Sequence, residues 1–221
     1  MNNFVWVLLV NLLIIAIAGV LARLVPGEKI RKDEDPIPWK WTTRDIVIVA
    51  VLAAIVGIIQ TGESYIFQAS LALGGALGSA VFQGAFGWGY VIAFMLIRKP
   101  GAMFVFAILE TSVEALTGNP AGIYTVGWGV TQGLAAEAVM AFIRWNKMSP
   151  WVFFLTSAVN AQFGTVWSWY LYGWEDTMRA YWLSIPLTLL AGGIISGLLG
   201  YVIGKALSKS GLIRAARTKT E

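Results

Sequence analysis

The stretch FVWVLLVNLLIIAIAGVLA, residues 4–22, decides the fold class because it contains no charged residue. About 20 apolar residues in an α-helix cross the ~30 Å hydrocarbon core of a membrane. Comparable apolar stretches follow at 45–61, 77–97, 102–117, 123–143, 151–171 and 181–205, in a chain of 221 residues that is 57% hydrophobic. The sequence therefore predicts an all-α fold: a polytopic membrane helix bundle with a six-helix core and one extra N-terminal transmembrane helix.

Lysine and arginine residues gather outside these stretches, in clusters at 23–44, 98–99, 144–147 and 205–219. Placing all four clusters in the cytoplasm satisfies the positive-inside rule for every basic residue except Arg179. This arrangement predicts seven crossings, with the N-terminus outside and the C-terminus in the cytoplasm. The expected segments are an N-terminal transmembrane helix at 1–25, a charged cytoplasmic linker at 26–41, a six-helix membrane domain at 42–208 and a basic cytoplasmic tail at 209–221.

Seven crossings require residues 62–99 to cross the membrane only once. Residues 64–76 are then expected to form an outer loop or a re-entrant segment, with the glycine-rich run GGALG at 74–78 marking the break. On the last predicted helix small residues recur every four positions, at Gly192, Ser196, Gly200 and Gly204. Close helix packing is the favoured interpretation of that ridge.

The chain contains neither cysteine nor histidine. This excludes disulfides, thiol chemistry and the commonest transition-metal ligands, and with them a hydrolase that depends on histidine. No GxxxxGK[ST] phosphate loop is present. The net charge of +4 comes from clusters beside membrane segments, which does not favour nucleic acid as a partner. We therefore expect no enzyme activity, cofactor or metal.

Two acidic residues, Glu110 and Glu114, interrupt the apolar stretch at 102–117, and residues 101–143 contain no basic residue. Their spacing puts both on one face of a helix. An uncompensated carboxylate at membrane depth costs about 2.5–3.5 kcal/mol. A proton, hydrogen-bonding neighbours or a ligand must offset that cost, and a ligand is favoured. Glu137 points away from the other candidates on an ideal helix, so a structural role is predicted for it.

Aromatic and amide side chains accompany the carboxylates. Tyr124, Trp128 and Gln132 are spaced by four and form one stripe in the outer half of the next predicted helix. Asn160 and Trp167 lie in the middle and outer half of the following one. An aromatic belt at the lipid interface accounts for some of the rings but not for the amides. Carboxylates beside aromatic rings suit an organic cation that carries hydrogen-bond donors.

Four short runs resemble those of one family of membrane proteins. They are TRDIV at 43–47, RKPGA at 98–102, VEAL at 113–116 and QGLAAE at 132–137. In this order they resemble the YkoE family, substrate-binding S components of energy-coupling factor (ECF) transporters, associated with thiamin and its hydroxymethylpyrimidine precursor. The resemblance covers residues 41–214 and implies a six-helix S-component core. The helix at 4–22 goes beyond the usual pattern.

The resemblance also implies partners. A ligand is captured at the outer face, and an ECF transmembrane coupling protein with two cytoplasmic ATPase subunits drives its uptake. Ala50 and Ala54 match a small-residue pair that docks on the coupling protein in these transporters, although internal packing is the other interpretation. Members are sometimes labelled cobalt permease components, but metal-importing S components use histidine-rich N-termini and this chain has no histidine.

The leading hypothesis is therefore a substrate-binding subunit for thiamin or a related aminopyrimidine in a prokaryotic cell (inner) membrane. The predicted ligand-binding residues are Glu114, Glu110, Tyr124, Trp128, Gln132, Asn160 and Trp167. Glu114 is the preferred anchor and Glu110 the alternative one. The competing hypothesis is a stand-alone proton- or cation-coupled carrier for a small organic cation, which is less favoured because no inverted repeat is detectable.

Overall fold

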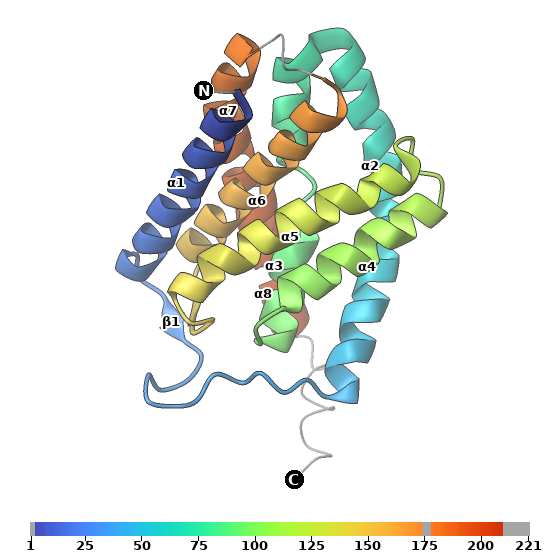
Figure 1. Ribbon diagram of the computed structural model, residues 1–221. Coiled ribbons are helices and arrows are strands. Elements are labelled where there is room, and N and C mark those ends of the chain that lie inside the picture. The colour runs from blue at the N-terminus through green and yellow to red at the C-terminus, as the bar shows by residue number, and fades with distance from the viewer. Residues whose placement is uncertain (1–2, 174–177, 210–221) are drawn as a thin grey trace.

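The computed structural model describes residues 3–173 and 178–209, which form one helical bundle (Figure 1). Its elements, in chain order, are α1 (Asn3–Leu24), β1 (Glu28–Lys29), α2 (Thr43–Gln83), α3 (Trp88–Ile97), α4 (Ala102–Leu116), the 3-10 helix η1 (Gly122–Tyr124), α5 (Thr125–Phe142), β2 (Lys147–Met148), α6 (Pro150–Leu171), α7 (Met178–Ala191), the π-helix η3 (Gly192–Leu198) and α8 (Leu199–Lys209). Of the predicted basic tail at 209–221, all but Lys209 lies outside the described residues.

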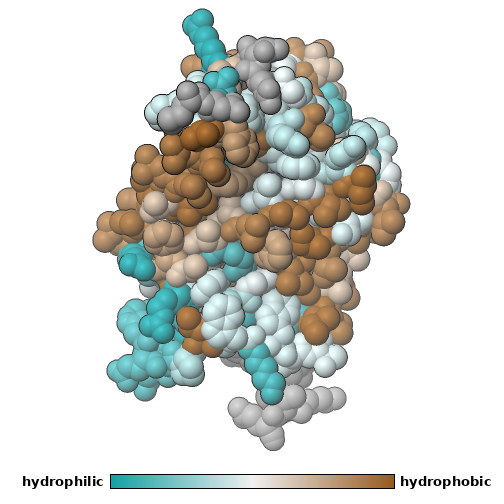
Figure 2. Space-filling model, in the orientation of Figure 1, coloured by the Kyte–Doolittle hydropathy of each residue, from teal (hydrophilic) through white to brown (hydrophobic). Residues whose placement is uncertain are grey.

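Apolar side chains cover the outside of the bundle. Those of α1 and α2 include Leu13, which is 58% exposed, and Ile58, which is 60% exposed. Figure 2 shows brown apolar side chains across the middle of the molecule and teal hydrophilic ones at the lower end. Four stretches are long and apolar enough to cross a membrane: Asn3–Leu24, Thr43–Gly75, Leu77–Ile97 and Met178–Lys209. The prediction of an all-α polytopic membrane bundle is confirmed.

Helix α2 corrects one expectation and confirms another. It begins with a capping box, in which the Thr42 hydroxyl accepts from the Asp45 amide while the Asp45 carboxylate accepts from the Thr42 amide. The helix then continues through residues 64–74, so the predicted outer loop is wrong. The break falls inside the glycine-rich run as expected, at Gly75, whose φ of 55° and ψ of −147° suit glycine. Ser64 and Phe67 are buried against the bundle in this part of α2, whereas Leu73 near the break is 91% exposed.

The small-residue ridge at the end of the chain packs against two helices. A Cβ on Gly192 would lie 2.5 Å from Ala161 Cβ on α6, and a Cβ on Gly200 would lie 2.7 Å from the Trp88 carbonyl oxygen on α3. Neither position has room for a side chain. The helix-packing interpretation is therefore confirmed.

The linker after α1 is joined to the loop between α5 and α6. Strand β1 pairs antiparallel with β2, with Glu28 opposite Met148 and Lys29 opposite Lys147. The Lys147 ammonium donates to the carbonyl oxygens of Ala22, Arg23 and Val25 at 3.1, 2.7 and 3.0 Å. These bonds satisfy carbonyls left unpaired at the end of α1, so the extra N-terminal helix is an integral part of the bundle.

Candidate functional site

A cavity opens among α2, α4, α5 and the end of α6, where polar side chains face inward. The cavity and its mouth enclose about 420 Å³. Its lining consists of Gln60, Ser64, Phe67, Gln68, Gln83, Phe86, Glu110, Thr111, Glu114, Asn119, Ala121, Thr125, Trp128, Gln132 and Tyr172. Carboxylate and aromatic side chains together form the walls of this cavity.

The two carboxylates of α4 both face the cavity, but their surroundings differ. Glu114 Oε2 accepts from Asn119 Nδ2 at 2.6 Å and from Ser64 Oγ at 3.1 Å. Glu110 is completely buried, and among the described residues its oxygens meet no hydrogen-bonding group except the neighbouring Glu114 carboxyl. The charge neighbouring Glu110 is that of Glu114, a like charge. Glu110 is therefore the carboxylate that remains available to a ligand.

Two further lining residues carry buried polar atoms without a partner. The Gln132 Oε1 accepts from the Tyr90 hydroxyl at 3.0 Å, whereas its Nε2 has no acceptor in the described part of the chain. The Thr125 hydroxyl is likewise unpaired there. Leaving such atoms buried and unpaired costs about 1–3 kcal/mol each. The cavity therefore offers an unused carboxylate, an unused amide donor and an unused hydroxyl.

Aromatic rings form the other walls. Phe67 and Phe86 pack edge to face with their centroids 6.0 Å apart, and Trp128 lies 6.3 Å from Tyr172. The Trp128 indole nitrogen donates to the Gly164 carbonyl oxygen and to another acceptor, each at 3.1 Å. Because its N–H is held by α6, the orientation of the Trp128 ring is set before any ligand enters.

The cavity has an acidic character. None of its lining residues is lysine or arginine. The two ion pairs found between described side chains, Lys29–Asp33 and Lys99–Asp45, involve no lining residue. Within the described ranges no group of three or more histidine, cysteine, aspartate or glutamate residues is arranged to hold a metal ion. A positively charged organic group or a set of N–H donors would complement the site.

Four of the residues predicted from sequence meet at this cavity: Glu110, Glu114, Trp128 and Gln132. Glu137, for which a structural role was predicted, lies elsewhere. Its carboxylate accepts from the Met103 amide at 2.8 Å and from the Trp145 indole at 2.5 Å, at the start of α4. An acceptor at a helix N-terminus satisfies otherwise unpaired amides, which agrees with the structural role.

Three predicted ligand-binding residues do not line the cavity. Tyr124 is 60% exposed, because it ends the 3-10 helix η1 and the four-residue stripe of α5 does not extend to it. Asn160 lies behind the lining, where its Nδ2 donates to the Gln132 carbonyl oxygen at 3.3 Å. Trp167 packs edge to face on Trp128 at 6.4 Å and donates to the Tyr124 carbonyl oxygen. Asn160 and Trp167 therefore support the lining from behind, whereas the Tyr124 side chain lies outside the site.

The sequence interpretation missed the contribution of α2. Gln60, Ser64 and Gln68 all line the cavity and are spaced by four residues, which puts them on one helical face. That spacing is visible in the sequence and could have indicated a polar helical face. It was overlooked because residues 64–76 were expected to leave the helix. Asn119, in the turn after α4, had no such signal, since its position depends on how that turn folds back.

The predicted docking pair lies on the outer, apolar face of α2, away from the cavity. Ala50 and Ala54 are exposed on α2. Their neighbours Val47 and Val51 are each 55% exposed. The described residues leave this apolar face of α2 uncovered.

Comparisons with known proteins agree with this architecture. The sequence model of the family described as "ABC-type cobalt transport system, permease component" matches residues 44–163. The HMP/thiamine permease protein YkoE of Bacillus subtilis (strain 168) is 29% identical over 177 residues, which cover 78% of this chain and 87% of that protein. A crystal structure of an S-component of an ECF transporter superposes with a TM-score of 0.74 and 26% identity, covering 80% of this chain and 90% of that one. The chain therefore belongs to this permease-component family and is an ECF S component of the YkoE type.

Proposed function

We propose that this S component captures thiamin or its hydroxymethylpyrimidine precursor at the outer face of the membrane, for uptake driven by partner subunits. The observation that carries the proposal is the set of unpaired polar atoms around one cavity, on Glu110, Gln132 and Thr125. Atoms that are costly to bury alone become favourable when a ligand supplies their partners.

An aminopyrimidine has the matching groups. Its exocyclic amine and protonated ring nitrogen donate to a carboxylate, and such charge-assisted bonds are about twice as strong as neutral ones. Its remaining ring nitrogen accepts from an amide such as Gln132 Nε2. Its flat ring fits between aromatic walls that include Trp128 and Tyr172. The narrowness of the cavity supports binding through the single pyrimidine ring that the two compounds share.

The donor set argues against cobalt as the cargo, although the family's description mentions it. Divalent transition metals favour imidazole and thiolate ligands, and this chain has no histidine or cysteine. Of the lining residues, only Glu110 and Glu114 carry charge. The relative from Bacillus subtilis bears the name of an HMP/thiamine permease, which supports the organic ligand.

Uptake requires partners that this chain does not contain. The exposed face of α2 around Ala50 and Ala54 suits the close approach of a helix from the ECF coupling protein, because small residues let backbones come together. Two ATPase subunits would supply the energy, since the chain has no phosphate loop. The proposed orientation puts the basic clusters and the C-terminus in the cytoplasm and the N-terminus outside.

Titration of the purified chain in detergent tests the ligand class. Tryptophan fluorescence should respond to thiamin and hydroxymethylpyrimidine, because Trp128 lines the cavity, and should not respond to riboflavin or Co²⁺. A response to Co²⁺ alone would overturn the proposal. Reconstituted vesicles that hold the chain without partner subunits should not accumulate thiamin in a pH gradient, whereas such accumulation would support the stand-alone carrier.

A further inference from the structure

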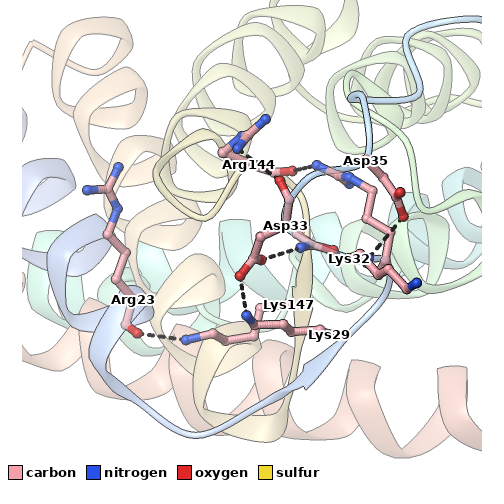
Figure 3. Close-up of polar contacts among 9 residues, drawn as sticks. Arg23, Lys29, Lys32, Asp33, Asp35, Arg144 and Lys147 are labelled. Carbon is pink, nitrogen blue, oxygen red and sulfur yellow. Dashed lines mark hydrogen bonds and ion pairs between the residues drawn. The ribbon is translucent and has the colours of Figure 1, made fainter.

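A second cavity lies at the other end of α5 from the ligand site, between the end of α1 and the loop before α6. The cavity and its mouth enclose about 620 Å³. It is lined by Arg23, Arg31, Asp33, Phe142, Ile143, Arg144 and Asn146. Figure 3 shows the side chains of Arg23, Asp33 and Arg144 gathered around the linker. Three of its seven lining residues are arginines.

No ion pair between described residues neutralises the charge of these arginines, although Asp33 and Asp35 lie near enough to Arg31 to favour its charge. Their hydrogen bonds go to backbone carbonyl oxygens: Arg23 Nε to Phe142 at 2.5 Å, and Arg144 to Asp33 at 3.4 Å. Arg31 donates to the carbonyl oxygens of Arg144 and another loop residue. None of the three forms an ion pair with a described carboxylate.

The acidic residue in the lining is already engaged. The Asp33 carboxylate is paired with the Lys29 ammonium and accepts from Asn146 Nδ2 at 3.1 Å. The Lys29 hydrogen bond is the main cause that lowers the pKa of Asp33. Lys147 is engaged as well, because it caps the end of α1. Lys29 and Lys147 are thus structural, whereas the three arginines form no close ion pair with a described carboxylate.

The Arg31 side chain has a hydrogen-bond donor that the fold leaves unused. Its Nε is buried and has no hydrogen-bond partner among the described residues. Burial and the neighbouring Arg144 guanidinium lower the pKa of Arg31 by more than Asp35 and Asp33 raise it. A guanidinium keeps its proton in proteins, so the repulsion persists until an anion relieves it. A buried donor, two like charges and an open cavity together describe an anion site.

The surroundings indicate which anion. Arg23 lies in the last turn of the apolar helix α1, whose outward side chains Leu21 and Leu24 are 41% and 75% exposed. Phe142 and Ile143 add apolar lining beneath the arginines. Basic cavities between transmembrane helices at the membrane surface bind phospholipid headgroups, and guanidinium groups match phosphate oxygens in geometry. We propose that Arg23, Arg31 and Arg144 bind the phosphate of an anionic phospholipid, whose acyl chains lie along α1.

Native mass spectrometry of the full-length chain tests this inference. The protein, purified in detergent, is incubated with equal amounts of phosphatidylglycerol and phosphatidylcholine. We expect phosphatidylglycerol to be retained preferentially, and Arg31→Gln or Arg144→Gln to lower the retained fraction at least fivefold. The matched control Arg179→Gln removes the same charge from an exposed position on α7 and should retain lipid like the unmodified chain.

Equal retention by the unmodified chain and both site variants would overturn the inference. Circular dichroism and gel filtration confirm folding, and if Arg31→Gln fails to fold, the exposed Arg144 carries the test. Inorganic phosphate is titrated separately, without lipid. No binding at millimolar phosphate is expected, whereas binding that Arg144→Gln abolishes would overturn lipid as the source of the phosphate. Failure here leaves the aminopyrimidine proposal untouched, because the two sites lie at opposite ends of α5.

Discussion

Replacing Glu110 by glutamine tests the ligand site most directly. The structure leaves both Glu110 oxygens buried beside no group but the Glu114 carboxyl, whereas Glu114 already accepts from Ser64 and Asn119. A glutamine keeps the shape of the side chain but removes its charge and turns one acceptor into a donor. A hydrogen bond to a charged group contributes about 1.5–3 kcal/mol. At 1.4 kcal/mol per tenfold, the dissociation constant for hydroxymethylpyrimidine should rise about 10- to 150-fold.

Isothermal titration calorimetry on the purified variant measures that change. The matched control is Glu137→Gln, which neutralises another carboxylate of the bundle that lies outside the cavity. Without ligand, the Glu110 variant should unfold at a temperature no lower than the unmodified chain, because it loses a buried charge that had no partner. Unchanged affinity in Glu110→Gln, or an equal loss in both variants, would refute the assignment of Glu110 as the anchor.

Three further predictions concern other parts of the molecule. A Cβ in Gly164→Ala would lie 2.1 Å from Gln132 Nε2, so this variant should displace the Gln132 amide. Calorimetry should then show ligand binding weakened several-fold, whereas retained affinity would remove Gln132 from the site. Ala54→Leu should reduce co-purification of the coupling protein while ligand affinity stays the same, and undiminished co-purification would argue for docking elsewhere. Because the chain has no native cysteine, a membrane-impermeant maleimide should label Ile123→Cys on intact cells but Lys32→Cys only after permeabilisation. The reverse pattern would contradict the proposed orientation.

Local sequence patterns predicted the helices well where hydrophobicity was uninterrupted. The stretch at 102–117 became α4, which begins at Ala102 and ends at Leu116, and the stretch at 151–171 became α6. The prediction failed at 64–76, where a single crossing by residues 62–99 and the glycine-rich run suggested an outer loop or a re-entrant segment. A helix is maintained there by packing, and burial of Ser64 and Phe67 against other helices is a non-local property.

For the site, too, local spacing predicted some features and the tertiary structure decided others. The i, i+4 spacing was enough to predict that Glu110 and Glu114 share a face, and the stripe on α5 was enough for Trp128 and Gln132. Spacing alone could not reveal that Tyr124 turns outward, since that depends on a 3-10 turn before α5.

The amino-acid sequence by itself determined that this chain is a membrane-spanning helical bundle with carboxylates inside, because helix formation and membrane insertion depend on local composition. Only the tertiary structure decided which carboxylate remains free. Ser64 and Asn119 approach Glu114 across 50 and 5 residues of chain, and no comparable donor approaches Glu110 among the described residues. Whether a buried carboxylate is satisfied depends on the neighbours that folding brings to it, here one from a distant helix and one from a turn whose path the local sequence does not specify.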